Sequence, residues 1–399
     1  MLMKKALSIL VLISLILILV FSLLFTWRPE LIKVVEYQVP DANTYKAYPQ
    51  TMVHPADTAF HFAKAAANRN DLDTLHVLDG QNHLIPFADY VKEGKISLFM
   101  VIRNDSIIYQ KYAPGYSDTT LTTLFSVAKT MVSIMLGQAV EEGKIKSLDD
   151  PLLKYVPELK ANPAFEHITM RNLFDMKSGL KFEDTNGSYI HAFLSDEARF
   201  YYTDDIKKEL LKVTLDKTPG TVYKYESIDA FLLTWALEKA TGEKISTYFQ
   251  DNLWRKIGTE YAASWGLDHP NGLANTASRF QCTAIDLAKI GRLYLLGGQY
   301  NGHQIVPQEW VSQSVKLVKG EEPATAKGWQ KTAHHALWWV PQQGVYGDYA
   351  AEGMLGQRLY MDPLTNTIIV QFAAKGAGDY PYRKISRYLS GLPFDYPKP

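Results

Sequence analysis

The stretch Leu124-Phe125-Ser126-Val127-Ala128-Lys129-Thr130-Met131-Val132 places a hydroxyl and an amine three residues apart. If a helix begins here, Ser126 and Lys129 lie one above the other on the same helix face. A serine is a poor nucleophile until a base takes its proton, and a neutral amine one turn away can act as that base. The pair therefore predicts acyl transfer through Ser126. The alternative is that Ser126 is only the N-cap of the helix.

The surrounding sequence separates this pair from a second match to the same spacing. Residues 127–140 are apolar almost throughout and are followed by Gly143. This pattern predicts a buried helix of about four turns. Ser178 and Lys181 have the same spacing, but a glycine between them stands where the preceding apolar helix would end. We therefore interpret the second match as a helix C-terminus.

Composition excludes several classes of function. The 399 residues are 47% hydrophobic and carry 42 basic and 42 acidic side chains, so nothing suggests a nucleic-acid partner. The single cysteine, Cys282, rules out an internal disulfide and is interpreted as a small buried residue rather than a reactive thiol. His334 and His335 are adjacent and would point to opposite faces of a strand, which argues against a metal pair. No zinc spacing, phosphate loop or dinucleotide fingerprint is present, so we expect no metal and no cofactor.

The N-terminus predicts a membrane anchor. Lys4 and Lys5 precede an uncharged run over residues 6–27, which is long enough to span a bilayer. The exit Phe25-Thr26-Trp27-Arg28 is too bulky for a cleavage site, although a cleaved signal peptide is the alternative. We expect residues 1–5 in the cytoplasm and a single-pass protein of the bacterial inner membrane. The catalytic domain would then be periplasmic or extracytoplasmic.

The rest of the chain predicts an α+β protein. Residues 28–85 are expected to be an extension with a short helix over 56–67, residues 86–392 the globular domain, and residues 393–399 a tail. The expected elements of the domain are strands at 96–102, 107–112, 359–361 and 367–372, helices that begin after Thr169 and Thr283, a helix over 230–240 and a last helix over 383–389. Strands at both ends with helices between them predict an antiparallel sheet built from both ends of the domain, with a helical insert.

One tyrosine has a position that suits catalysis. Tyr225 follows the turn Thr218-Pro219-Gly220 and a short extended run, and it precedes the helix over 230–240. A phenol on such a loop can point into a cleft. The alternative is a packing role, which most of the 24 tyrosines will have.

Three segments together carry a resemblance to a known family. They are Phe125-Ser126-Val127-Ala128-Lys129, Tyr225-Glu226-Ser227 and Ala351-Glu352-Gly353-Met354. In this order and spacing they resemble the serine β-lactamase and penicillin-binding-protein superfamily. The resemblance covers roughly residues 90–392 and is greatest for the branch of 6-aminohexanoate-dimer hydrolases and β-lactamase-fold esterases. It implies a β-lactamase/transpeptidase-like fold.

The resemblance also implies roles for individual residues. Ser126 would be the nucleophile and Lys129 its base, a role that needs an uncharged amine. Tyr225 would protonate the leaving group or activate the deacylating water. The N–H groups of Ser126 and Met354 would form the oxyanion hole. Gly353 would let the strand backbone approach the substrate closely.

Departures from the family pattern bear on the substrate. Ala351 and Glu352 stand where the family carries Lys or His and then Thr or Ser, and Ser227 stands where it often carries Asn. The candidate substrate-binding residues are Ser227, Glu352 and Gly353. Glu352 could instead be a solvated strand residue. The departures argue against an efficient β-lactamase or D-Ala-D-Ala carboxypeptidase. They favour a small ester or amide substrate with a neutral or cationic acyl group.

The sequence thus predicts an exported, membrane-anchored serine hydrolase that works through a Ser126 acyl-enzyme. Three alternatives stay open. They are a penicillin-binding-like protein of the same fold that acylates slowly or not at all, a β-lactamase or D-Ala-D-Ala carboxypeptidase, and a structural partner-binding domain.

Overall fold

The computed structural model describes residues 2–79, 81, 83–183, 194–317, 332–341, 347–374 and 381–394. The α-helices are α1 (Leu2–Trp27), α2 (Glu30–Tyr37), α3 (Phe87–Glu93), α4 (Val127–Glu141), α5 (Met170–Phe174), α7 (Asp196–Tyr202), α8 (Ile206–Leu210), α9 (Ser227–Thr241), α10 (Ile245–Phe249), α11 (Ala284–Leu295), α12 (Gln308–Ser314) and α13 (Tyr382–Leu389). The strands are β1 (Gln50–Val53), β2 (Ala63–Lys64), β3 (His76–Leu78), β4 (Leu84–Pro86), β5 (Ile96–Arg103), β6 (Ser106–Tyr112), β7 (Thr122–Thr123), β8 (Ala263–Gly266), β9 (Phe280–Cys282), β10 (Gln299–Tyr300), β11 (His303–Gln304), β12 (Thr332–His335), β13 (Trp338–Pro341), β14 (Tyr349–Gly353), β15 (Gln357–Asp362) and β16 (Thr367–Ala373).

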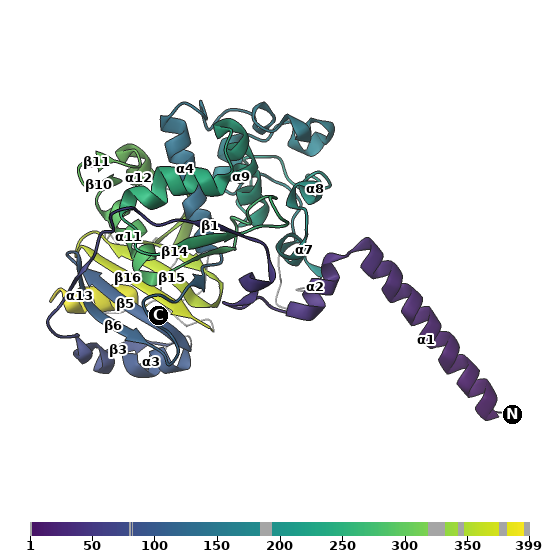
Figure 1. Cartoon of the computed structure of the whole chain (residues 1–399), viewed down its shortest axis with the longest axis horizontal. Coiled ribbons are helices and arrows are strands. Elements are labelled where there is room, and N and C mark those ends of the chain that lie inside the picture. Colours follow the sequence, from purple (N-terminus) through teal and green to yellow (C-terminus); the bar gives the residue numbers. More distant parts are fainter. Residues whose placement is uncertain are drawn as a thin grey trace.

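The central sheet draws its strands from both ends of the chain, as the sequence predicts. Its order is β12-β13-β14-β15-β16-β5-β6-β2. All neighbours are antiparallel except β2, which runs parallel to β6. Helices α11 and α4 pack on one face of the sheet, and α3 and α13 pack on the other (Figure 1). The predicted α+β class with a helical insert is therefore confirmed.

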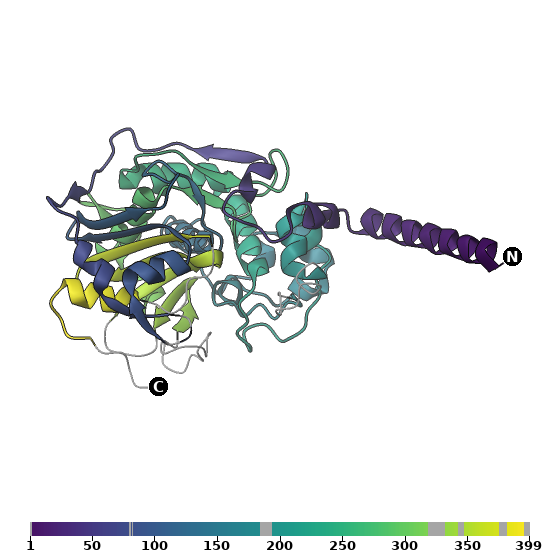
Figure 2. The same cartoon turned by 90° about the horizontal axis from the view of Figure 1, so that it is seen from below.

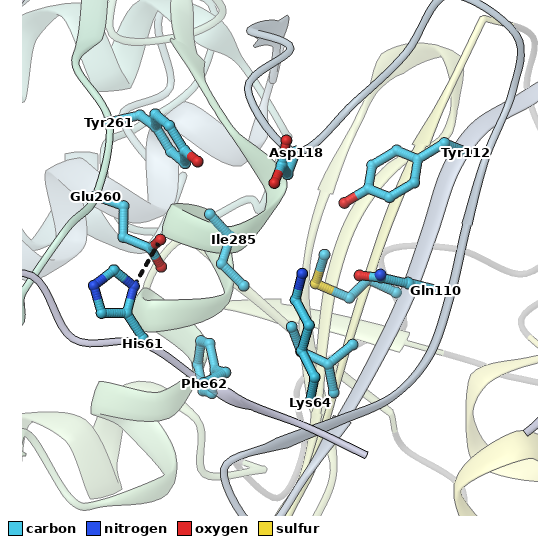
Figure 3. Close-up of a pocket in the computed structure, with 11 residues that line it drawn as sticks. His61, Phe62, Lys64, Gln110, Tyr112, Asp118, Glu260, Tyr261 and Ile285 are labelled. Atoms are coloured by element: carbon cyan, nitrogen blue, oxygen red, sulfur yellow. Dashed lines mark ion pairs between the residues drawn. The ribbon is translucent and has the colours of Figure 1, made fainter. Parts of the chain in front are cut away.

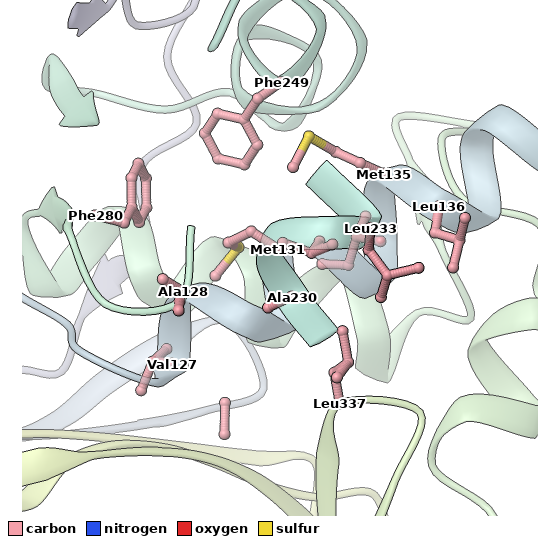
Figure 4. Packing of buried hydrophobic residues seen from close by; sticks show 14 of the residues in the cluster. Val127, Ala128, Met131, Met135, Leu136, Ala230, Leu233, Phe249, Phe280 and Leu337 are labelled. Atoms are coloured by element: carbon pink, nitrogen blue, oxygen red, sulfur yellow. The ribbon is translucent and has the colours of Figure 1, made fainter. Parts of the chain in front are cut away.

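The helix after Ser126 forms the centre of the larger hydrophobic core. Every residue of α4 from Val127 to Ala139 is buried, as its apolar sequence predicts. Met131 and Met135 pack among apolar side chains that include Leu233 of α9 and Phe249 of α10 (Figure 4). Burying each such side chain contributes about 1.5–3 kcal/mol. This packing fixes the helix that carries Lys129.

Residues 28–85 belong to the body of the protein rather than to a separate extension. Strand β1 joins a second, four-stranded sheet of order β1-β8-β9-β7, in which β7 leads directly into the turn before Ser126. The hydroxyl of Thr123 in β7 also donates to the carbonyl of Ala42 at 3.0 Å. The helix predicted over 56–67 is wrong, because the N–H groups of Ala63 and Ala65 instead donate to carbonyls beside β6. These tertiary hydrogen bonds override the local amphipathic pattern.

The first helix projects away from this body. Figures 1 and 2 show α1 extending from the folded part of the chain, with the short helix α2 at its base. Within the described residues, none of the helices combines the length and the apolar character needed to cross a bilayer. The predicted anchor over residues 6–27 is therefore not supported.

Candidate active site

The backbone before α4 presents Ser126 at the start of the helix. Phe125 has φ of 48°, a left-handed conformation that is strained for a bulky residue and is often found at functional sites. The turn is fixed on both sides, since the N–H of Leu124 donates to the carbonyl of Phe280 at 2.8 Å and that of Val127 to the carbonyl of Leu124 at 3.3 Å. The side chain of Ser126 makes no capping hydrogen bond, so the alternative reading of Ser126 as an N-cap is not supported.

Lys129 lies against Ser126 in the geometry expected of a nucleophile and its base. Its Nζ donates to Oγ of Ser126 at 3.1 Å and to the carbonyl of Ala277 at 2.9 Å. The side chain is only 1% exposed. No carboxylate among the described residues forms an ion pair with it. The distance is within the reach required for proton transfer, and the carbonyl of Ala277 fixes the direction of the amine.

Tyr225 completes a cluster with these two residues. It lies on the loop just before α9, and the centre of its ring is 5.1 Å from Nζ of Lys129. In the part of the chain that the structure describes, its hydroxyl makes no hydrogen bond with Ser126 or Lys129. The structure therefore brings together the three residues that the sequence nominates for catalysis, with the phenol near the amine.

Strand β14 brings the third segment against the same turn. A Cβ atom on Gly353 would lie 2.2 Å from the carbonyl oxygen of Leu124, so only glycine permits this approach. The next residue, Met354, begins a short 3₁₀ turn and has a side chain that is 42% exposed. Its backbone is thereby held beside the Ser126 turn. This placement suits an oxyanion hole formed by the N–H groups of Ser126 and Met354.

Two of the candidate substrate-binding side chains are committed elsewhere. The hydroxyl of Ser227 is buried and donates to Oε1 of Glu197 in α7 at 2.9 Å. Glu352 alternates with Ala351, which faces the core around α4, and so lies on the opposite face of the sheet. There its Oε2 is 3.6 Å from Nη2 of Arg358 on the neighbouring strand. In the described part of the chain, neither side chain forms a hydrogen bond or an ion pair with Ser126.

The structure adds His334, which sequence reasoning considered only as a metal ligand. Its imidazole in β12 is 6% exposed and packs edge-on against the Tyr225 ring, with ring centres 4.9 Å apart. Burial, assisted by the positive charge of Lys129, lowers the pKa of His334 to about 3. Trp339 of β13 also packs against Tyr225, at 5.6 Å. The pairing of β12 with β13 creates this aromatic wall, and no local motif announces it.

The second serine–lysine match has a structural role. Ser178 is buried and its Oγ accepts from the N–H of Leu180 at 3.4 Å, within a turn rather than a helix. Gly179 has φ of 71°, and a Cβ atom there would lie 2.2 Å from the carbonyl oxygen of Lys217. Nearby, burial raises the pKa of Asp229 well above its ordinary value. Ser178 and Lys181 lie beyond the end of α5 at Phe174, so no helix carries Lys181 onto the face of Ser178, as the interpretation of a helix C-terminus predicts.

A separate pocket of about 200 Å³ lies apart from Ser126 and its partners (Figure 3). Its walls come from residues near β2 and from β5, β6 and α11. In Figure 3 His61 and Glu260 meet at one side, where Nδ1 and Oε2 are 3.0 Å apart. Lys64 and Tyr112 line the other side. The pocket shares no residue with the catalytic cluster.

Two curated hydrolases are similar to this chain in sequence. A 6-aminohexanoate-dimer hydrolase from Paenarthrobacter ureafaciens is 28% identical over 302 residues, which cover 71% of this chain and 74% of the relative. The D-alanyl-D-alanine-carboxypeptidase/endopeptidase AmpH of Escherichia coli K12 is 28% identical over 187 residues, which cover 43% of this chain and 46% of AmpH.

Solved structures share the fold. A Bacillus anthracis structure described as a 6-aminohexanoate-dimer hydrolase has a TM-score of 0.75 at 23% identity, covering 88% of this chain and 94% of its own. EstCE1, a hydrolase with promiscuous acyltransferase activity, has a TM-score of 0.55 at 15% identity, covering 72% and 91%. The sequence model of the Beta-lactamase family matches residues 89–389, well over half of the chain. The chain therefore belongs to the Beta-lactamase family, and it is a serine hydrolase of the β-lactamase fold.

Proposed function

We propose that this protein hydrolyses a small carboxylic ester or amide through an acyl-enzyme on Ser126. The observation that carries the proposal is the contact between Nζ of Lys129 and Oγ of Ser126 at 3.1 Å. The hydroxyl is paired with a buried amine at the start of a buried helix, and the backbone of Gly353 approaches closely. Nucleophilic acyl transfer needs such an arrangement.

Acylation follows from this geometry. Oγ of Ser126 attacks the substrate carbonyl while its proton passes to the lone pair of Lys129. The carbonyl of Ala277 accepts one N–H of that amine at 2.9 Å, which holds Nζ beside Oγ. The carbonyl oxygen gains negative charge, which the N–H groups of Ser126 and Met354 stabilise. The bond to the leaving group then breaks, and the leaving group takes a proton from the Lys129–Tyr225 pair.

Deacylation uses the same groups in reverse. A water molecule gives a proton to the Lys129–Tyr225 pair as it attacks the acyl carbonyl. The second tetrahedral intermediate collapses, the ester bond to Ser126 breaks, and the proton returns to Oγ. Each cycle adds one water across the substrate bond and needs no further reactant.

The relatives support a small amide or ester as substrate. One of them is named for the hydrolysis of a dimer of 6-aminohexanoate and another for carboxypeptidase activity. Ala351 offers no charge with which to hold a substrate carboxylate, and its side chain is fully buried. We therefore favour a neutral or cationic acyl group over a β-lactam or a D-Ala-D-Ala peptide.

Labelling with a fluorophosphonate tests the nucleophile. We expect stoichiometric labelling of the wild type and none of Ser126→Ala, whereas Ser178→Ala should label fully and serves as the matched control. Equal labelling of the wild type and Ser126→Ala would show that the nucleophile is wrongly assigned. Turnover of p-nitrophenyl butyrate should follow the labelling.

The second candidate is a penicillin-binding-like protein or a β-lactamase/D-Ala-D-Ala carboxypeptidase. The carboxypeptidase relative favours it. Nitrocefin separates the two functions, because we expect its turnover to be slower than that of the butyrate ester. Faster turnover of nitrocefin would favour the second candidate.

Location at the bacterial inner membrane, with an extracytoplasmic catalytic domain, stays a prediction that rests on residues 1–28 of the sequence. Fusion of alkaline phosphatase after residue 40 tests it in a bacterial host, since that reporter is active only after export. An inactive fusion would contradict the prediction.

A further inference from the structure

An imidazole forms part of the wall around Tyr225. The ring of His334 stands at 89° to that of Tyr225 with centres 4.9 Å apart, and at 66° to that of Trp339 at 4.9 Å. The ring of Tyr223 is 6.1 Å away. His334 is therefore enclosed by aromatic rings, one of which belongs to the catalytic cluster.

The β12–β13 hairpin fixes this imidazole relative to the nucleophile. Its turn residues Ala336 and Leu337 have φ of 51° and 66°, as in the tight turns that suit a twisted hairpin. The carbonyl of Leu337 accepts a hydrogen bond from the hydroxyl of Thr130 at 3.0 Å. Thr130 follows Lys129 in α4. The hairpin that carries His334 is thus attached to the helix that carries the base.

The imidazole is polar, buried and uncommitted. Its Nδ1 is shielded from solvent and has no hydrogen-bond partner among the described residues. Leaving such a nitrogen without a partner is costly, so the site favours a ligand that supplies one. Burial and then Lys129 keep the pKa of His334 at about 3, so the ring is uncharged near neutral pH. A neutral imidazole offers one donor and one acceptor.

Among the described residues, Lys129 is the one basic side chain placed over the Tyr225 ring, and its Nζ already contacts Ser126 and Ala277. Ala351, which stands where the family pattern has Lys or His, is uncharged. A carboxylate bound beside Tyr225 would lose its hydration without gaining a further counterion from the described residues. An uncharged polar group would lose less and could pair with the imidazole.

We propose that His334 is a specificity-determining residue that hydrogen-bonds to an uncharged polar group on the leaving-group side of the substrate. The site would then take esters and amides whose leaving group bears no carboxylate. This inference rests on the proposed acyl-enzyme function, in which Tyr225 serves the leaving group.

A matched pair of esters tests the inference. Butyrate esters of 3-hydroxybenzoic acid and of its methyl ester share the acyl group and differ in charge only on the leaving group. Steady-state kinetics with both esters would be measured for wild type, His334→Phe, which keeps a ring but loses the nitrogens, and His334→Gln, which keeps hydrogen-bonding groups. His335→Phe, the next residue on the same strand, is the control.

We expect the wild type to prefer the methyl ester at least about tenfold in kcat/KM. His334→Phe should lose about five- to tenfold on the methyl ester, the worth of one hydrogen bond, through a raised KM. The kcat/KM of His334→Phe for the acid should change little, so the ratio of kcat/KM between the methyl ester and the acid should fall. His334→Gln should keep most of the preference, and His335→Phe should match the wild type.

Several outcomes would overturn the inference. The first is a wild type with a higher kcat/KM for the acid than for the methyl ester. The second is a His334→Phe variant with wild-type kcat/KM for both esters. The third is an equal fall in the kcat of His334→Phe on both esters, which would mean that His334 only supports Tyr225. If His334→Phe fails to fold, His334→Met removes the same hydrogen bond. Fluorophosphonate labelling of each variant separates this failure from that of the proposed function, because a wild type that does not label would contradict the Ser126 chemistry itself.

Discussion

Replacement of Gly353 by alanine tests whether the backbone of β14 forms half of the oxyanion hole. The added Cβ atom would lie 2.2 Å from the carbonyl oxygen of Leu124. The strand must therefore move by about 0.8 Å to restore a contact of 3.0 Å, the shortest that real Cβ atoms adopt. Leu124 cannot yield easily, since its N–H donates to the carbonyl of Phe280 at 2.8 Å. The movement of the strand would therefore displace the backbone N–H of Met354, the next residue.

Such a movement should be costly to catalysis. Sites of this kind tolerate an error of only about 0.5 Å, and loss of one oxyanion donor costs about 2.7–4 kcal/mol, or about 10²–10³-fold in kcat. We expect kcat for p-nitrophenyl butyrate to fall by this factor in Gly353→Ala. Overpacking should also lower the free energy of unfolding by about 1–3 kcal/mol.

A control separates catalysis from stability. Gly143→Ala, at φ of 69° beyond the end of α4, meets no atom within 4 Å of its Cβ. It should lose about 1–2 kcal/mol of stability from backbone strain but keep its kcat. Both variants would be assayed well below their melting temperatures. If Gly353→Ala is folded and retains more than a third of the wild-type kcat, the assignment of Met354 to the oxyanion hole is wrong.

Four further outcomes follow from the same structure. Lys129→Met should lower kcat by about 10²–10⁴-fold without loss of folding by circular dichroism, since it removes the base but keeps the buried chain. Tyr225→Phe should lower kcat by about 10²-fold while the ring contacts persist, and an unchanged kcat would remove the hydroxyl from the mechanism. The pKa of His334 falls from 6.5 to about 3 on folding, so the unfolded chain alone takes up a proton below pH 6.5 and stability is lost as pH falls toward 3. Urea denaturation at pH 6.5 and at pH 5 measures this loss. Between these two pH values, the free energy of unfolding should fall by about 2 kcal/mol less in His334→Phe than in wild type. Deletion of residues 2–27 should leave activity unchanged, whereas deletion of residues 2–53 should prevent folding because it removes β1, and a folded product would contradict that role.

The elements that the sequence predicts well are those with local signals. The apolar run after Ser126 indicates a buried helix, and the structure has α4 over Val127–Glu141. The strands predicted at 96–102 and 107–112 form β5 and β6, and the tight turn between them has φ of 49° at Asn104 and 58° at Asp105. Thr283 caps its helix through the N–H of Asp286 at 3.3 Å, although the Asp286 carboxylate turns to the backbone of residues 260–261. Each of these features is decided within a few residues.

Other parts depend on partners that are distant in the sequence. The amphipathic pattern over 56–67 suits a helix, but β6 offers backbone partners about 40 residues later, and the chain pairs with them instead. The sequence of residues 50–53 does not predict their pairing with β8, which lies more than 200 residues away. Glu352 looked like a candidate in the third segment, and only the register with Arg358 reveals which face of the sheet it takes.

The aromatic wall around Tyr225 also depends on residues that are distant in the sequence. Ser126 and Lys129 lie in one helical turn, so their chemistry is visible in the sequence. The wall around Tyr225 is built by β12 and β13, whose register places His334 opposite Trp339. Neither residue neighbours a motif, and their contact with Tyr225 spans more than 100 residues of chain. Under the proposed role of His334, residues within one helical turn would set the reaction, while a distant hairpin would set the preference for the leaving group. The ester pair tests that separation directly, since changes at His334 should alter preference and leave labelling of Ser126 intact.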